Sequence, residues 1–205
     1  MRDPVEPLLR PVALADLRPT QMTVGFSEVA RKRKLWREHV DRDGPDFLGH
    51  HMIPAVIGPK SVPWIIDHHH LALALIAEGV AHVFVSIVAD LRHLKRSDFL
   101  TFMDNRNWIH PYNAKGERCD HDALPKKIKH IADDPYRSLA GEVRRAGGYA
   151  KTDTPYSEFL WADFFRGTFD QKALTKDVET TITKAIALGH SSKAAHLPGF
   201  CGPDS

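Results

Sequence analysis

Cysteine is scarce in this chain of 205 residues, which contains only Cys119 and Cys201. The two lie far apart and neither has a second cysteine close by. The sequence therefore has neither the paired spacing of a zinc knuckle nor that of a redox pair. A disulfide scaffold is not expected at this size, and we expect both thiols to be reduced, as they are in the cytoplasm.

Long apolar runs are also absent. No window approaches the roughly 18 apolar residues of a membrane-spanning helix, and the first residues lack the apolar core of a signal peptide. We therefore expect a soluble, cytoplasmic protein with no membrane partner.

The chain also lacks a strong excess of charge of one sign. Its 28 basic and 26 acidic side chains give a formal charge of +2, which is not the strongly basic balance of a dedicated nucleic-acid binder. A hydrophobic fraction of 42% supports a packed core. Histidine is the unusual residue, with 13 copies.

The apolar patterns predict an α+β protein with a small mixed sheet. Proline and alternating apolar residues before residue 20 indicate an extended arm or edge strand, and Ser27 is expected to cap a helix that reaches Trp36. The region that follows predicts a hairpin-like pair of strands at 53–57 and 62–66, a helix at 71–78 and a strand at 81–88.

The chain after residue 95 is predicted to be helical. Asp134 followed by a proline is typical of a helix start, further helices are expected at 157–166 and 175–188, and the tail from residue 191 is expected to be frayed. We interpret residues 1–95 as an α/β core. Residues 96–205 are interpreted as a helical extension that packs on this core within one structural domain.

The most distinctive motif is Asp67-His68-His69-His70, which lies between a strand-like apolar run and an Ala/Leu-rich helix. Ligand crevices of open α/β sheets lie at such strand ends, and a helix N-terminus suits an anion such as phosphate. Asp67 could orient a hydroxyl or a metal-bound water, and His69 and His70 could bind phosphate or carry a proton. The alternative is that Asp67 only caps the helix while the histidines pack inside.

A metal site is a second interpretation of the histidines. Three consecutive histidines cannot all face one ion, so a ligand set would need one or two of them plus a partner from elsewhere, such as His50, His51, Asp67 or Glu28. The sequence contains neither His-Glu-x-x-His nor Cys-x-x-Cys.

The order of these motifs resembles the ParB/sulfiredoxin superfamily, and within it the branch of ParB-like nucleases. The resemblance rests on Pro19-Thr20-Gln21, the helix after it, residues 54–57 and residues 65–75, and it covers roughly residues 10–90. It implies a strand-turn-helix core that cradles nucleotide phosphates, as in relatives that use ATP, ADP or CTP with Mg²⁺.

The resemblance also implies roles for individual residues. Asp67, His69 and His70 would occupy the phosphate-binding and catalytic turn, and either Gln21 or Glu28 lies where kinase-like relatives place an acidic base. His68 stands where the relatives have glycine, and His70 where they have arginine, which removes a permanent charge. We also expect His68, Gln21, Arg31 and Lys60 to contact substrate or phosphate.

Three hypotheses follow from the sequence. The first is an enzyme of nucleotide-dependent phosphoryl transfer that acts on a small molecule and uses Asp67 or Glu28 as base. The second is a histidine-based enzyme on a small metabolite, with a bound metal or no cofactor. The third, which the charge disfavours, is a nucleic-acid-binding or nuclease module that uses the basic run 31–34 together with Lys126, Lys127 and Lys129.

Overall fold

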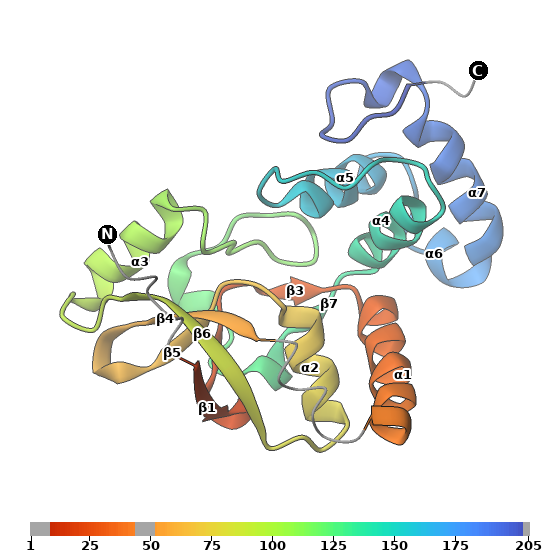
Figure 1. The fold of residues 1–205 in the computed structure, drawn as a ribbon. Coiled ribbons are helices and arrows are strands. Elements are labelled where there is room, and N and C mark those ends of the chain that lie inside the picture. Colours follow the sequence, from red (N-terminus) through yellow and green to blue (C-terminus); the bar gives the residue numbers. More distant parts are fainter. Residues whose placement is uncertain (1–8, 44–51, 203–205) are drawn as a thin grey trace, which may run out of the picture. The chain divides into compact units, whose positions relative to one another are not determined.

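The computed structural model describes residues 9–43 and 52–202, and its elements are labelled in Figure 1. These residues form two compact units. Unit 1 contains the described residues up to Thr23 together with Val29–Asn113 and Glu117–Ala132. Unit 2 contains Val24–Glu28, Ala114–Gly116 and the described residues from Asp133 onward.

Unit 1 is built on a five-stranded mixed sheet, so the predicted α+β class with a mixed sheet is confirmed. The strand order is β1-β6-β4-β5-β2. Two neighbouring pairs are antiparallel, β1 with β6 and β4 with β5, and two are parallel, β4 with β6 and β2 with β5. The strands are β1 (Leu9–Ala13), β2 (Arg18–Pro19), β4 (Ile53–Ile57), β5 (Pro63–Ile65) and β6 (His82–Asp90).

Both edges of this sheet carry proline. Pro11 lies in β1 and Pro19 in β2, the two outermost strands. A proline cannot donate a hydrogen bond to a neighbouring strand, so it is tolerated at an edge. The predicted edge strand near the start of the chain is confirmed.

A tight turn joins β4 to β5 and confirms the predicted hairpin. The turn contains the short 3-10 segment η3 (Pro59–Ser61), in which Lys60 and Ser61 have φ values of 61° and 58°. Two consecutive left-handed residues define the type of turn whose twist matches that of the paired strands.

The core of unit 1 holds α2 (His69–Ala77) and α3 (Arg96–Asn105). The α2 helix is apolar on most sides and buries Leu71, Ala72, Ala74 and Leu75, as expected for a helix inside a domain. The α3 helix packs through Phe99, whose ring lies 5.4 Å from that of Trp64 in β5. Short 3-10 segments complete the unit: η1 (Leu14–Asp16), η4 (His121–Ala123) and η5 (Ile128–His130).

The α1 helix (Phe26–Asp43) corrects two sequence predictions. It begins at Phe26, so Ser27 lies inside its first turn and is not the cap. Val29 and Trp36 are buried, whereas Phe26 is 45% exposed and Ala30 is also exposed. The α1 helix is longer than predicted, and only one narrow apolar stripe of its surface is buried.

Ion pairs join α1 to the C-terminal end of α2 within unit 1. Arg33 donates to Glu78 at 2.6 Å, and Arg37 donates to both oxygens of Glu78 at 2.7 Å. These hydrogen bonds lower the pKa of Glu78 to about 2. An acid at the negative end of the α2 dipole is unfavourable, and the two arginines offset this repulsion of Glu78.

Unit 2 is helical, as predicted for the later part of the chain. Two short strands, β3 (Thr23–Val24) and β7 (Ala132–Asp133), pair with each other, and the second residue of each strand belongs to unit 2. The helical elements are α4 (Pro135–Arg145), α5 (Ser157–Arg166), α6 (Ala173–Lys176), α7 (Val178–Gly189) and the 3-10 segment η6 (Ser192–Ala194). The predicted start of α4 is confirmed, because Asp134 is its N-cap and accepts from the Tyr136 N–H at 3.0 Å.

Two predictions for this unit were wrong. The expected helix at 175–188 is interrupted at Asp177, whose φ of −142° is not helical, so α6 and α7 are separate. The tail over residues 191–202 is packed and not frayed: Ala194 and Leu197 are buried, and the Trp161 indole N–H donates to the Pro198 carbonyl at 2.8 Å. Burial of apolar side chains stabilises this segment despite its glycines and prolines.

Within the described residues, no helix combines the length and the apolar composition needed to span a membrane. The packing of residues 96–205 on residues 1–95 as one structural domain stays a prediction.

Candidate functional site

Parallel pairing of β2 with β5 creates the candidate site. Arg18 is paired with Trp64 and Pro19 with Ile65, so both strands run in the same direction. Their carboxyl ends therefore meet at one edge of the sheet, where ligands of α/β proteins commonly bind. Thr20 and Gln21 leave β2 at this edge, and the turn that leads to α2 leaves β5 there.

The turn has a left-handed backbone at His68, with φ of 63° and ψ of 25°. This conformation is costly for most L-residues and is typical of glycine, although histidine is among the side chains that adopt it more often. His68 therefore keeps the backbone geometry that a glycine would supply, and it adds an imidazole to the turn.

The α2 helix starts at His69 without a side-chain cap. His68 is the N-cap residue, and its carbonyl accepts the first helical hydrogen bond from the Ala72 N–H at 2.9 Å. Asp67 accepts from the His68 backbone N–H at 2.6 Å instead of capping α2. The interpretation of Asp67 as the helix cap was thus wrong.

Asp67 is a strongly acidic, accessible carboxyl group. Its side chain is 72% exposed, and His68 Nδ1 lies 3.6 Å from its Oδ2 atom. Hydrogen bonding and charge from His68 lower the pKa of Asp67 to about 2, against a smaller opposing effect of desolvation. A carboxylate of such low pKa is a weak base and suits the binding of cations or donors better than proton abstraction.

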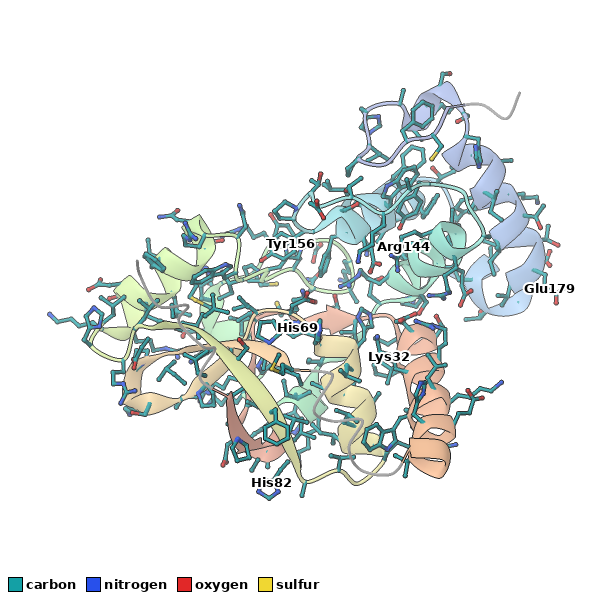
Figure 2. All side chains as sticks on the ribbon, in the orientation of Figure 1. Lys32, His69, His82, Arg144, Tyr156 and Glu179 are labelled. Carbon is teal, nitrogen blue, oxygen red and sulfur yellow. The ribbon has the colours of Figure 1, made fainter. Side chains whose placement is uncertain are left out.

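His69 is buried, with 2% of its surface exposed. The Thr20 backbone N–H donates to its Nε2 atom at 3.1 Å, which requires the neutral imidazole with its proton on Nδ1. The Thr20 hydroxyl lies 3.3 Å from the same nitrogen and donates to the Ile65 carbonyl at 2.8 Å. Figure 2 labels His69 at the beginning of α2, so one side chain ties this helix to the end of β2.

A third segment reaches the site through His110, which the sequence did not single out. The His110 N–H donates to the Thr20 carbonyl at 2.8 Å, and His110 forms a parallel bridge with the buried Gln21. The His110 ring stacks on Tyr112 at 4.3 Å between ring centroids. An alternation of apolar with ring-bearing residues over 108–112 was the available signal for this extended segment.

Other predicted residues lie apart from this turn or pair elsewhere. Lys60 is in the β4–β5 hairpin, which precedes β5, whereas Asp67 follows β5. Arg31 is exposed on α1, and His70 is the half-buried second residue of α2. Glu28 belongs to unit 2, where Arg145 donates to it at 2.5 Å.

The metal hypothesis gains no ligand cluster from the part of the chain that the structure describes. Those residues contain no group of three His, Cys, Asp or Glu side chains placed to hold one ion. His50 and His51, the proposed additional ligands, lie outside the described residues.

Comparison with known proteins assigns the chain to a family. Residues 10–167 match the family model described as "Putative ParB-like nuclease". The match spans most of the chain, so this protein belongs to the ParB-like family, and the resemblance drawn from the sequence is confirmed.

A solved structure extends the similarity to almost the whole chain. The crystal structure of protein Atu1540 from Agrobacterium tumefaciens is 49% identical in sequence and superimposes with a TM-score of 0.91. The similarity covers 97% of this chain and 100% of that one. No curated protein matches the chain.

Proposed function

We propose that the turn before α2 binds a phosphorylated small molecule and that the protein catalyses nucleotide-dependent phosphoryl transfer. The observation that carries the proposal is the uncapped start of α2 behind a left-handed His68. Such a start presents backbone N–H groups and the positive end of a helix dipole, which together bind phosphate. The family assignment and the sulfiredoxin-like order of elements suggested by the sequence agree with this proposal.

The side chains of the turn modify this anion site. His70 follows directly, at the position where the sequence resemblance expects arginine, so its contribution to phosphate binding depends on protonation. Asp67 is an exposed carboxylate beside the same backbone and would repel a metal-free phosphate. A Mg²⁺ ion carried by the phosphate oxygens would neutralise this repulsion and stabilise charge in the transfer.

The contacts of Asp67 and Glu28 limit which of them can act as the catalytic base. Asp67 has a pKa of about 2, which makes it a weak proton acceptor and a better ligand for Mg²⁺. Glu28 is engaged with Arg145 in unit 2. We therefore assign to Asp67 the binding of a metal ion or of a hydrogen-bond donor. The proton acceptor is then either His70 or a group of the substrate itself.

The first experiment measures the melting temperature with ATP, ADP and CTP, each with and without Mg²⁺. A nucleotide at a hundredfold excess over its Kd stabilises the protein by about 2.7 kcal/mol, which corresponds to roughly 5–11 °C for a chain of this size. The proposal is abandoned when none of the three nucleotides raises the melting temperature under either condition.

Two substitutions sharpen this test. His70→Arg supplies a permanent cation and is expected to tighten nucleotide binding at least about tenfold, because a charge-assisted hydrogen bond contributes about 1.5–3 kcal/mol. His82→Arg makes the same change at an exposed histidine at the start of β6 and should leave the affinity unchanged. Equal effects of the two substitutions would show general electrostatic attraction and not a site at the turn.

Asp67→Asn tests the role of the carboxylate. Removal of its charge is expected to strengthen metal-free nucleotide binding and to reduce the gain that Mg²⁺ provides. An unchanged Mg²⁺ dependence in this variant would remove Asp67 from the proposed metal site.

The family description favours a second candidate, a nuclease or nucleic-acid-binding module. The basic residues suggested for it are partly engaged: Arg33 binds Glu78, Lys34 lies 3.9 Å from Glu38, and Lys127 donates to the Ala15 carbonyl. Retention of an oligonucleotide at about 50 mM salt and its release at 200 mM would favour this candidate, because phosphate contacts release counterions.

A further inference from the structure

A segment beside the candidate site carries three partly accessible rings. Trp108, His110 and Tyr112 occupy alternate positions and are half-buried, whereas Ile109 and Pro111 between them are buried. The Tyr112 N–H donates to the His110 carbonyl at 3.0 Å, so the chain turns at Pro111 and brings these two rings together. The three rings, named here the ring row, are therefore the more accessible side chains of this segment, and Trp108 also packs against the core cluster that contains Ile109.

The ring row is held in place by ordered contacts. The rings of His110 and Tyr112 are nearly parallel, with an angle of 20° and a centroid separation of 4.3 Å. The Arg106 guanidinium lies 5.0 Å from the centre of the Trp108 ring, and Phe102 packs against this ring edge-on at 6.0 Å. Planar rings together with a cation suit a ligand that is both aromatic and anionic.

The ring row is connected to the phosphate-binding turn through one residue. Thr20 donates its N–H to His69 at the start of α2 and accepts at its carbonyl from the His110 N–H. A bridge between Tyr112 and Arg118 holds the far end of the segment. The ring row and the turn therefore lie in the same unit, on either side of Thr20.

We propose that the ring row is a stacking surface for the base of a nucleotide whose phosphates bind at the turn before α2. This inference rests on the proposed phosphate site and names its ligand class as a nucleoside phosphate, not a sugar phosphate or free phosphate. Stacking of a base on an aromatic side chain contributes about 1–3 kcal/mol, so the base should strengthen binding about 5- to 150-fold.

The experiment compares ATP with tripolyphosphate, both with Mg²⁺, by calorimetry. The protein is expected to bind ATP at least fivefold more tightly. Trp108→Leu and Tyr112→Leu should each reduce this preference while tripolyphosphate binding stays the same. Phe26→Leu replaces an exposed aromatic residue of unit 2 and should retain the full preference. Melting temperatures identify variants that fail to fold.

Tryptophan fluorescence provides a second readout. The chain has four tryptophans, of which Trp36, Trp64 and Trp161 are buried and Trp108 is half-buried. ATP should therefore quench mainly Trp108. Trp108→Phe keeps a ring for stacking, so it should abolish the quenching while it retains the preference for ATP.

The outcomes separate the two proposals. Equal affinity for ATP and tripolyphosphate overturns the stacking surface and leaves the phosphate site intact, as does a preference that survives in both leucine variants. Binding of neither ligand overturns the phosphate site and the inference that rests on it. If ATP and tripolyphosphate bind equally tightly but a single-stranded oligonucleotide binds through the ring row, a free nucleotide is not the ligand. The surface is then assigned to a nucleic-acid strand.

Discussion

Replacement of His69 by leucine should destabilise the protein because it removes the hydrogen-bond acceptor of a buried backbone group. His69 is almost fully buried, and its Nε2 atom accepts from the Thr20 N–H at 3.1 Å. Thr20 is itself buried. Its hydroxyl is held in place because it donates to the Ile65 carbonyl at 2.8 Å.

The size of this destabilisation follows from the Thr20 N–H, which loses its hydrogen-bond acceptor. A buried N–H without a partner costs about 1–3 kcal/mol, and leucine is similar to histidine in volume, so the cavity contribution is small. We expect His69→Leu to lose about 1–3 kcal/mol of unfolding free energy, or roughly 2–12 °C in Tm for a chain of this length. His69→Gln offers an amide oxygen as acceptor and should lose less.

Urea denaturation and amide exchange test this prediction together. The unfolding free energies of His69→Leu, His69→Gln and wild type are compared, and His82→Leu serves as the control because His82 is exposed. The Thr20 amide should exchange faster with solvent in His69→Leu. The reasoning is refuted when His69→Leu lies within about 0.5 kcal/mol of wild type, the usual range for a neutral surface substitution, and Thr20 stays protected.

Two further predictions concern unit 1. Glu78→Gln should lose about 0.5–2 kcal/mol at pH 7 by weakening its pairs with the two arginines of α1. The low pKa of Glu78 places this stabilisation above pH 4.5, and it is lost as the pH falls toward 2. Urea midpoints of variant and wild type should therefore converge near pH 2 to 3; a constant difference would exclude this carboxylate as the cause. Lys60→Asn combined with Ser61→Gly should raise stability by about 1 kcal/mol, because these residues suit the left-handed backbone of the hairpin turn; a lower urea midpoint would contradict this.

Local patterns in the sequence predicted most of the elements. The hairpin of β4 and β5 follows from two apolar runs around Gly58-Pro59, and the start of α4 follows from Asp134 before Pro135. These features depend on residues that are close in sequence, so turn and capping preferences decide them. The position of Asp67 at a strand-to-helix turn was predictable for the same reason.

Long-range contacts were not predictable in this way. The tail over residues 191–202 resembles a loop by composition, yet it buries Leu197 and accepts a hydrogen bond from Trp161. The break at Asp177 also interrupts a pattern that is helical throughout. In the tail, the packing of distant side chains overrides local preference.

The sequence by itself determined the α+β class, the order of the elements and the place of the histidine motif between β5 and α2, because each depends on short-range apolar periodicity and turn chemistry. Only the tertiary structure decided what the motif residues do. It turned the His68 backbone left-handed, left Asp67 exposed, and buried His69 against Thr20, 49 residues away in the chain. It also brought His110 to the carbonyl of Thr20. Hydrogen bonds of this kind join segments with no common pattern in sequence, so only the assembled sheet specifies them.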